Sequence, residues 1–458
     1  MGQTIVFLLA GGEGARLYPL TKDRSKPAVP FGGMWRLADF TLSNCLHSGL
    51  NRIYVLTQYK SESLTRHLYQ TWQFFRPVLG ESINVLPPQL RETRDFYRGT
   101  ADAVYQNMYT IQREGARDVV IVSGDHVYAM DYRPFIAYHH ENDADLTIAT
   151  FPVPRAEAHR FGILRAREDG RVTSFVEKPK DLSHTLPNED GKVNASMGVY
   201  VFKAQVLLRE LQEGPGMGRK FDFGGDIIPG MINRERVFLY AFRKGALGHK
   251  AYWRDVGTLD SYFEANMDLL GPSPEFNVHN RQWPIIHSPD QTGPSVLGGG
   301  SAGSVRNAIV AGGCRIDGEV SDCVIFSNVT VEAGARVSQA ILLPGAYVEA
   351  NTIVRNAILD KDVRIRRGTI IGAGSTPAAA RHGKKVVYTP AGIAVVAKGD
   401  VVGAERIERA AVRALGDEVL MDHEAGGPLP ILSEAVLPER APGQGREPVP
   451  VFHDGERP

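Results

Sequence analysis

Cysteines and long apolar runs are scarce in this sequence of 458 residues, and each scarcity excludes a class of protein. The three cysteines, Cys45, Cys314 and Cys323, match no metal-ligand spacing. We therefore expect buried, reduced thiols and a cytoplasmic protein. No apolar run is long enough to cross a bilayer. The first one, residues 5–10, is too short for a secretory signal and lacks its basic flank.

Net charge is absent as well, because 52 lysines and arginines balance 52 aspartates and glutamates. We therefore expect neither a nucleic acid nor a membrane as a partner, and any phosphate binding has to come from local clusters. With 43% hydrophobic residues the chain has the composition of a globular protein, and its length predicts two or three domains.

A glycine-rich turn near the N-terminus is the first informative feature that is present. Residues 5–10 predict a buried strand. It leads into Gly11, Gly12 and Gly14, followed by the cations Arg16, Arg24 and Lys26. Glycines let backbone N–H groups approach a phosphate chain, and the cations supply countercharge. The spacing fits neither the dinucleotide fingerprint nor a P-loop, so the pattern indicates another nucleotide site, with a plain tight turn as the alternative.

Residues 1–270 alternate short strand-like runs with helical patterns. Strands are predicted over 53–57, 119–123, 146–150 and 198–202, and helices over 61–75 and 101–114. This alternation predicts an α/β domain with a mostly parallel sheet and helices on both faces. Ligands bind such sheets at the carboxyl ends of the strands, where the glycine loop and Asp125 both fall.

The pattern changes after a connector over 271–295. Similar segments begin at Val305, Val320, Val337 and Val354, which are 15, 17 and 17 residues apart. This period predicts a parallel β-helix over 296–403, with the small fourth residue of each repeat pointing inward. A chance valine spacing in a β-sandwich is the alternative. Residues 404–458 are rich in proline and predict a weakly ordered tail, with a possible short helix over 405–416.

Carboxylates at turn glycines indicate a metal site. Asp125 follows a buried strand, and Asp255 precedes another turn glycine. Carboxylates in such places hold Mg²⁺ against substrate phosphates, although either acid alone could cap a helix. Glu177 and Lys178 follow a strand and suit a sugar phosphate, with a surface ion pair as the alternative. The helix start at 98–103 is either an anion site or a capped terminus.

Ordered motifs over residues 5–403 resemble the sugar nucleotidyltransferases. The motifs are Gly-Gly-x-Gly-x-Arg-Leu at 11–17, Arg24-x-Lys-Pro, 97–104, 123–128, 175–179, 195–198, 222–224, 252–257 and 281–284. Together they are most similar to the ADP-glucose pyrophosphorylases, or glucose-1-phosphate adenylyltransferases, of bacterial glycogen synthesis. The resemblance implies a Rossmann-like catalytic domain followed by a left-handed β-helix, and a homotetramer.

The resemblance also implies roles for individual residues. The catalytic residues would be Arg16, Lys26 and Asp125. ATP would be bound by Gly11, Gly12, Gly14, Gln89, Tyr97, Gly99 and Thr100, and Mg²⁺ by Asp125 and Asp255. Glucose 1-phosphate would be bound by Gly162, Glu177, Lys178, Ser196, Tyr200, Asp222 and Trp253. Effectors would be bound by Arg24, Arg36, Arg381, Lys384 and Lys385.

The implied reaction joins ATP and glucose 1-phosphate to give ADP-glucose and pyrophosphate, with sugar phosphates as activators and AMP or phosphate as inhibitors. Asp23 stands where some relatives carry an activator-binding lysine, so we expect an altered activator preference. Three alternatives remain at this point. They are transfer to another sugar or from another nucleotide, a noncatalytic regulatory subunit, and acyl transfer on the β-helix, whose coils show no exposed catalytic histidine.

Overall fold

The computed structural model describes residues 3–89, 96–182, 187, 190–214, 220–287, 292–298, 303–372 and 385–403. The predicted tail over 404–458, including its possible helix, lies outside these residues. So do Arg381 and Lys384, two of the expected effector contacts. In the described part of the chain, no helix combines the length and the apolar character needed to span a membrane.

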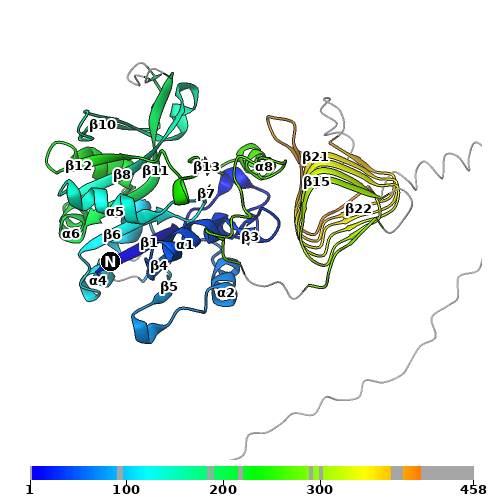
Figure 1. The fold of residues 1–458 in the computed structure, drawn as a ribbon, viewed down its shortest axis with the longest axis horizontal. Coiled ribbons are helices and arrows are strands. Elements are labelled where there is room, and N and C mark those ends of the chain that lie inside the picture. The colour runs from blue at the N-terminus through cyan, green and yellow to red at the C-terminus, as the bar shows by residue number, and fades with distance from the viewer. Residues whose placement is uncertain are drawn as a thin grey trace, which may run out of the picture. The chain divides into compact units, whose positions relative to one another are not determined.

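A large sheet forms the centre of the N-terminal part (Figure 1). Its strands are β1 (Thr4–Ala10), β4 (Arg52–Thr57), β5 (Ser82–Leu86), β6 (Asp118–Ser123), β8 (Leu146–Pro154), β9 (Gly162–Ala166), β10 (Val172–Glu177), β11 (Lys192–Lys203) and β12 (Val237–Ala241). The order is β10-β9-β11-β6-β1-β4-β5, with β8 paired to β11 and β12. The predicted parallel sheet is confirmed for β6, β1, β4 and β5. Beyond β6 the pairing is mixed, because β11 runs antiparallel to both β6 and β8, whereas β12 pairs parallel with β8.

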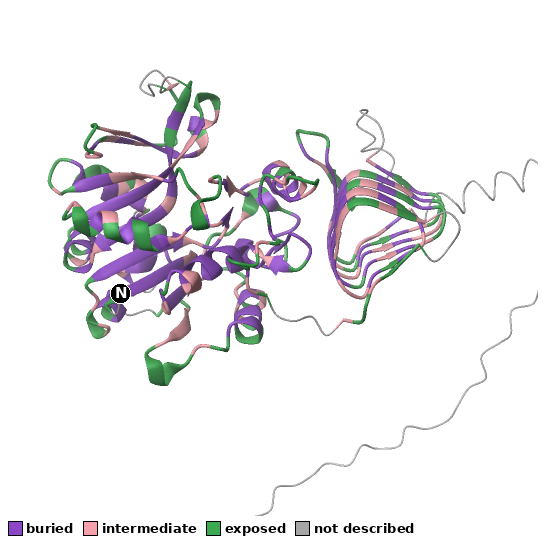
Figure 2. Ribbon diagram, viewed as in Figure 1, coloured by how far each residue is buried: buried purple, intermediate pink, exposed green. Residues whose placement is uncertain are grey.

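Helices pack on both faces of this sheet. They are α1 (Leu37–His47), α2 (Glu62–Thr71), α3 (Thr100–Tyr105), α4 (Met108–Arg113), α5 (Tyr132–Glu141), α6 (Ala204–Gln212) and α7 (Ile228–Met231). Helix α8 (Leu259–Met267) packs instead in a separate hydrophobic cluster. Val6 and Leu8 of β1 join the hydrophobic cluster that includes residues of α1 and α2. The alternate residues Ile5 and Phe7 join a second cluster with α3. Strand residues that alternate in this way bury both faces of the sheet, whose central strands β1, β4 and β6 are almost wholly buried in Figure 2.

The helix predicted over 101–114 is two helices in the structure, α3 and α4. The interruption falls at Gln106 and Asn107. The Asn107 amide donates to the carbonyl of Ala103 and to the Tyr97 hydroxyl, at 2.8 and 3.0 Å. A side chain that bonds to the backbone competes with helix continuation, so the sequence pattern alone overestimated the helix length.

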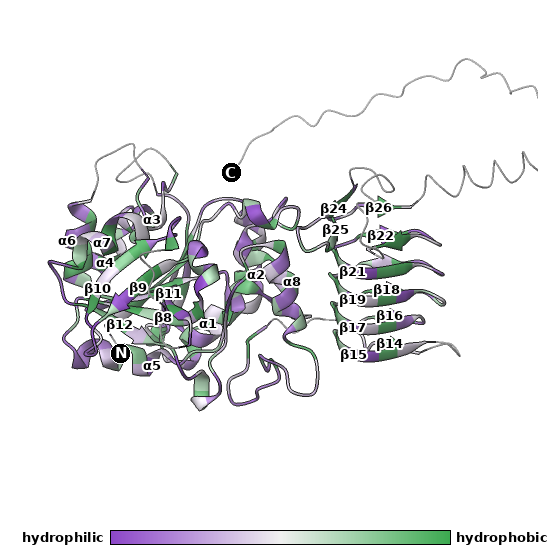
Figure 3. Cartoon of the chain, turned by 90° about the horizontal axis from the view of Figure 1, so that it is seen from above, coloured by the Kyte–Doolittle hydropathy of each residue, from purple (hydrophilic) through white to green (hydrophobic). Residues whose placement is uncertain are grey.

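Parallel coils form the C-terminal part, as the repeat predicts (Figure 3). One face holds β14 (Val296–Leu297), β16 (Arg315–Ile316), β18 (Thr330–Val331), β20 (Tyr347–Val348), β22 (Arg364–Ile365) and β26 (Val401–Val402). A second holds β15 (Ser304–Val310), β17 (Glu319–Ile325), β19 (Arg336–Leu342), β21 (Ile353–Leu359), β23 (Ile370–Ile371), β24 (Val386–Tyr388) and β25 (Ala394–Val396). The register aligns the small residues Ala308, Cys323, Ala340, Ala357 and Ala394 in one column. The last four are fully buried, so the inward orientation is confirmed for them, whereas Ala308 in the first coil is only half-buried.

Left-handed backbone conformations recur along the coils. The residue before each of the first four small residues has a positive φ, namely Asn307, Asp322, Gln339 and Asn356. Asn328, Gly345 and Asp362 form a second such series. Glycine, asparagine and aspartate adopt this conformation most readily, which explains their recurrence where each coil changes direction.

The coils and the N-terminal part share one hydrophobic core. Val324, Ile341, Ile358 and Val395 form a second register column, and all four are fully buried. This column packs in one cluster with Phe31, Phe40 and Tyr262. Helix α8, which carries Tyr262, lies against β17 and β19. The two parts are therefore joined by core packing as well as by the chain.

A buried ion pair crosses the same boundary. One guanidinium nitrogen of Arg24 donates to both carboxylate oxygens of Asp360, at 2.8 and 3.0 Å. The side chains are 5% and 1% exposed. The other terminal nitrogen, Nη1, has no hydrogen-bond partner among the described residues. A pair this deeply buried is sensitive to the loss of either member, because the remaining charge has no water to replace its partner.

We expect Arg24→Met to lower the free energy of unfolding by about 3 kcal/mol, since Asp360 is then buried without a counter-ion. The double variant Arg24→Met/Asp360→Leu removes both charges, so most of that loss is expected to be recovered. Chemical denaturation of both variants measures the difference. A double variant as unstable as the single one would contradict the ion-pair explanation.

Candidate active site

The glycine loop after β1 presents open backbone. A Cβ added at Gly12 would have no described atom within 4 Å. Gly14 has a φ of 69°, and its carbonyl accepts a 2.8 Å hydrogen bond from the Thr21 hydroxyl. A Cβ at Gly14 would lie 3.3 Å from the Lys26 Cβ. The loop is therefore fixed on one side and open on the other, as a backbone that receives a ligand requires.

Two carboxylates meet through a short two-stranded ladder. Asp125 follows β6, and β7 (His126–Tyr128) begins at the next residue. Strand β7 pairs antiparallel with β13 (Trp253–Asp255), so that His126 is opposite Asp255. A Cβ at Gly124 would lie 2.7 Å from the Leu8 side chain, which shows how closely this turn approaches β1. The ladder thus brings Asp125 and Asp255 to the sheet edge where the glycine loop begins.

The Lys26 ammonium lies between these two acids. Its Nζ is 2.7 Å from Asp125 Oδ2 and 3.2 Å from Asp255 Oδ1. Burial alone lowers the pKa of Lys26, but the two carboxylates outweigh it and the pKa is raised. Burial likewise opposes ionisation of Asp125 and Asp255, yet the Lys26 charge holds both carboxyl pKa values below the ordinary range. All three groups are therefore charged at neutral pH.

Two further basic side chains flank the acids. His126 Nε2 is 3.5 Å from Asp125 Oδ1 and 3.9 Å from Asp255 Oδ1. Arg160 Nη2 is 3.7 Å from Asp255 Oδ2 and 3.4 Å from the Asp255 carbonyl. The sequence motif contains His126, but its spacing suggests no role for it. Arg160 was missed altogether, because it ends a short 3-10 helix (Arg155–Arg160) that has no sequence signal near the acids.

Arg16 is exposed and lies near Asp255. A Cβ added at Gly257 would be 2.9 Å from Asp255 Oδ2 and 3.3 Å from Arg16 Nη2. Because Gly257 has no side chain, the space between the Arg16 guanidinium and the Asp255 carboxylate stays open. The expected grouping of Arg16, Lys26, Asp125 and Asp255 is what the structure shows.

The donor set of this cluster fits a divalent cation. Ligand atoms of Asp125, His126 and Asp255 all lie within 4.8 Å of one another. Two carboxylate oxygens suit Mg²⁺ or Mn²⁺, and an imidazole nitrogen is a ligand that Mn²⁺ also accepts. The two acids come from separate strands, so a cation here would bind β6 to β13.

A second group of predicted residues surrounds Glu177. Its carboxylate pairs with the Lys178 ammonium. A Cβ at Gly162 would lie 2.9 Å from Glu177 Oε2, and one at Gly224 only 2.4 Å from it. Lys178 has a left-handed backbone, and its N–H donates to the Phe161 carbonyl at 3.0 Å. A Cβ at Gly162 would also lie 2.3 Å from the Phe175 ring, so that glycine makes room for the ring, whereas Gly224 makes room for the carboxylate.

Ser196, Tyr200 and Trp253 connect the Glu177 region with the acids. The Ser196 and Tyr200 hydroxyls are 3.4 Å apart across a register shift in β11. Burial raises the pKa of Tyr200 to about 12, so its hydroxyl stays protonated. The Trp253 ring lies 5.3 Å from the rings of both His126 and Phe161. Trp253 therefore packs directly behind the acid cluster.

Asp222 occupies the N-terminus of α3. Its Oδ1 accepts from the Thr100 N–H at 2.9 Å and from the Thr100 hydroxyl at 3.2 Å, and its Oδ2 pairs with Lys220 at 2.8 Å. A Cβ at Gly99 would lie 2.1 Å from the Phe221 carbonyl oxygen. Gly99 is therefore required by a close backbone approach. Residues expected on the ATP side and on the sugar side of the site are in direct contact here.

The remaining residues expected to bind ATP differ in position. Tyr97 is buried, and its N–H donates to Gln58 Oε1 at 2.7 Å. A Cβ at Gly11 would be 3.3 Å from the Gln58 Cβ. Gln58, which no motif identified, therefore joins Tyr97 to the glycine loop. Gln89 is exposed and donates to the Pro87 carbonyl, two residues before it.

Two of the expected effector residues, Arg24 and Arg36, lie near a third basic side chain, Lys361. Arg24 is held by Asp360, and Arg36 donates to the Ser63 carbonyl at 3.0 Å and to its hydroxyl at 2.8 Å. Lys361 was missed by the sequence motifs. Burial and the charges of Arg36 and Arg24 lower its pKa to about 8. The Lys385 ammonium donates to the Val401 carbonyl at 3.1 Å.

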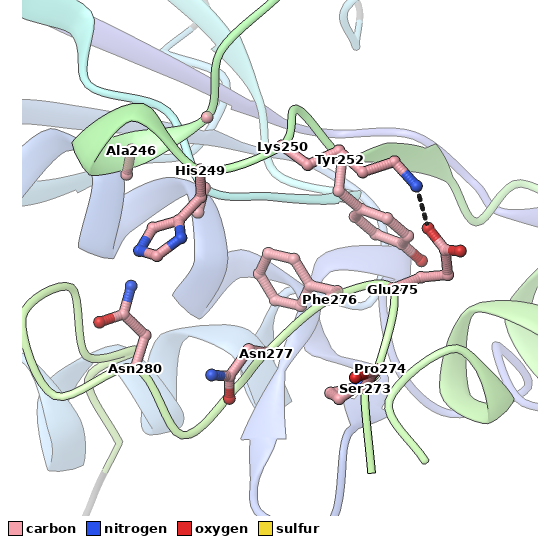
Figure 4. Close-up of a pocket in the computed structure, with 12 residues that line it drawn as sticks. Ala246, His249, Lys250, Tyr252, Ser273, Pro274, Glu275, Phe276, Asn277 and Asn280 are labelled. Atoms are coloured by element: carbon pink, nitrogen blue, oxygen red, sulfur yellow. Dashed lines mark hydrogen bonds and ion pairs between the residues drawn. The ribbon is translucent and has the colours of Figure 1, made fainter. Parts of the chain in front are cut away.

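A pocket of about 330 Å³ lies at the other end of the β7–β13 ladder (Figure 4). Ala129 and Tyr252, which adjoin the two strands, line it together with Phe276 and Asn280. Lys250 and Glu275 form a 2.7 Å ion pair at its side. The acids project from the opposite end of the ladder, so this pocket is distinct from the acid cluster.

Comparison with known proteins gives two family matches. The family described as "Nucleotidyl transferase" matches residues 5–271, and the family "GlmU-like, C-terminal hexapeptide" matches residues 297–396. These matches agree with the α/β part and with the left-handed β-helix. They cover both of the regions whose folds are described above.

Curated relatives span nearly the whole described chain. The chain is 44% identical over 375 residues to a glucose-1-phosphate adenylyltransferase of Methylococcus capsulatus, covering 81% of this chain and 88% of that protein. It is 45% identical over 381 residues to glucose-1-phosphate adenylyltransferase 2 of Vibrio cholerae, covering 81% and 93%. It is also 41% identical over 430 residues to a glucose-1-phosphate adenylyltransferase of Rhodopirellula baltica, covering 88% of this chain and 92% of that protein.

Proposed function

The chain belongs to the nucleotidyl transferase family, and we propose that it converts ATP and α-D-glucose 1-phosphate into ADP-glucose and pyrophosphate. The observation that carries the proposal is the acid pair with Lys26 beside an open glycine loop. We further propose that this reaction commits glucose to glycogen synthesis. The three cysteines, all buried and free, agree with a cytoplasmic enzyme.

The chemistry requires alignment more than proton transfer. A phosphate oxygen of glucose 1-phosphate attacks the α-phosphorus of ATP, and the bond from that phosphorus to the leaving pyrophosphate oxygen breaks. The attacking oxygen is already anionic near neutral pH, so no general base is needed. Catalysis then consists of holding two anions together and neutralising charge on the leaving group.

Each group of residues has a part in that task. The open N–H groups of the glycine loop receive the triphosphate, while Arg16 and Lys26 neutralise the departing pyrophosphate. Lys178 supplies countercharge to the sugar phosphate. Glu177 and the hydroxyls of Ser196 and Tyr200 suit sugar hydroxyls as hydrogen-bond partners.

Nucleotidyltransferases use a divalent metal, and we propose Mg²⁺ held by Asp125 and Asp255. When bound, Mg²⁺ would polarise the phosphoryl oxygens and stabilise negative charge on them. The carboxylates are suited to hold it because their pKa values are low, so both remain ionised at neutral pH.

We also propose allosteric control, in a homotetramer, through the neighbouring basic side chains of Arg24, Arg36 and Lys361, with Lys385 as a further candidate contact. Lys361 supports this, because after its burial the nearby charges of Arg36 and Arg24 lower its pKa further, and grouped positive charge favours binding of an anion. The expected effectors, which are activating sugar phosphates and inhibiting AMP or phosphate, are all anions. Asp23 is exposed beside Arg24, and its negative charge would weaken a sugar phosphate's binding.

Pyrophosphate release across a panel of nucleoside triphosphates and sugar 1-phosphates tests the proposed substrates. We expect ATP with glucose 1-phosphate to give the highest kcat/KM. Adding fructose phosphates and AMP to the same panel tests regulation. A clear preference for another nucleotide or sugar would replace the proposed reaction with that of a related transferase.

Asp125→Asn is expected to lower kcat by about a hundredfold or more, because the amide keeps the shape but loses the charge that holds the metal. Steady-state kinetics at saturating Mg²⁺ measure the effect. Turnover close to that of the unaltered enzyme would exclude Asp125 from the metal site.

Lys178→Ala is expected to raise KM for glucose 1-phosphate by about tenfold or more, with little change in KM for ATP, since the lysine pairs with only one substrate. Lys180→Ala removes an exposed lysine two residues away and serves as the matched control. Equal changes in both KM values would contradict the assignment of Lys178 to the sugar phosphate.

A further inference from the structure

The Lys26 ammonium takes up the carboxylate oxygens that the proposed metal needs. Lys26 Nζ lies 2.7 Å from Asp125 Oδ2 and 3.2 Å from Asp255 Oδ1, the bonding range of a charge-assisted hydrogen bond. The lysine is 8% exposed, so water does not replace these contacts. In the structure, the two acids are therefore already neutralised in part by a cation that belongs to the chain.

A divalent cation and this ammonium cannot share the position. Mg²⁺ or Mn²⁺ binds carboxylate oxygens at about 2.1 Å, and the ligand atoms here span no more than 4.8 Å. A cation bound to Asp125 Oδ2 and Asp255 Oδ1, the two oxygens that Lys26 contacts, would lie between them, where Nζ now lies. Two positive charges at that separation repel strongly in a buried site, so one must leave.

We propose that Lys26 is a tethered counter-ion of the two acids that would hold the metal, and that a divalent cation displaces it on binding to the same oxygens. Without Lys26, Asp125 and Asp255 would face each other as buried like charges. The inference rests on the proposed function in taking these two acids as the metal ligands. It adds that the metal must compete with a residue of the chain to reach them.

Displacement returns the ammonium to the glycine loop. The Lys26 Cβ lies 3.3 Å from the position of a Cβ at Gly14, so the side chain starts beside the loop that would receive the triphosphate. A released ammonium is then free to pair with phosphate oxygens. The Lys26 ammonium thereby neutralises the two acids before the metal binds and pairs with the nucleotide phosphates afterwards.

Arg160 provides a matched control for this competition. Its Nη2 lies 3.7 Å from Asp255 Oδ2, the carboxylate oxygen that Lys26 does not contact. Arg160 therefore adds positive charge near the acids without lying between them. Removing Arg160 changes the local electrostatic potential, whereas removing Lys26 also vacates the cation's position.

The experiment measures Mn²⁺ binding without substrates, by electron paramagnetic resonance or calorimetry, in Lys26→Met, Arg160→Met and the unaltered enzyme. If Lys26 holds the acids in more than nine-tenths of the molecules, its removal should tighten Mn²⁺ binding by about tenfold or more. Arg160→Met should tighten it by less than about threefold. Unchanged affinity in Lys26→Met, or equal tightening in both variants, would overturn displacement.

Asp125→Asn distinguishes failure of this inference from failure of the proposed function. We expect it to abolish Mn²⁺ binding at this site. If it binds Mn²⁺ as well as the unaltered enzyme does, the metal lies elsewhere, and the inference fails together with the proposed ligands. If only the Lys26→Met result is negative, the inference fails and the ligands stand.

Thermal unfolding keeps the inference testable if Lys26→Met folds poorly. Its two acids then repel each other, so its Tm in the absence of metal should fall below that of the unaltered enzyme. Mn²⁺ should raise the Tm of this variant more than that of the unaltered enzyme, because tighter binding to the folded state stabilises it more. An equal or smaller rise would overturn the inference.

Discussion

Mutual repulsion between two partly buried carboxylates is the constraint on which the active site depends. Asp125 and Asp255 come from strands far apart in sequence, and the β7–β13 ladder fixes them close together. Such a pair persists in an ionised state only with a cation beside it. Lys26 meets that need, and its position beside Gly14 ties the acids to the loop after β1. The close packing at Gly124 and Gly257 follows from the same convergence, since a side chain at either position would push the segments apart.

Much of this arrangement could be predicted from the sequence, because the relevant signals are local. The glycine loop, the acid after β6 and the repeat of the coils each lie within a few consecutive residues. Periodicity also gave the parallel centre of the sheet. The antiparallel strands beyond β6 left no such signal, since a short apolar run does not record the direction of its neighbour.

The contributions that were missed come from long-range contacts. Arg160 reaches Asp255 across 95 residues of chain, and Arg24 reaches Asp360 across 336. Gln58 accepts a hydrogen bond from the Tyr97 N–H, although the two residues are 39 positions apart in the chain. The break between α3 and α4 has the same origin, because the Asn107 amide finds a hydroxyl ten residues away. Spacing rules describe neighbours along the chain, and these pairs are neighbours only after folding.

The register of the coils has a consequence for how the length of this protein can vary. Val324, Ile341, Ile358 and Val395 contribute one residue per coil to the core shared with Phe31 and Phe40. Neighbouring strands in a stack are about 4.8 Å apart. Insertion or loss of a whole coil during evolution therefore changes the interdomain contact in steps of one residue and about 4.8 Å, whereas a partial insertion shifts every later residue out of its column.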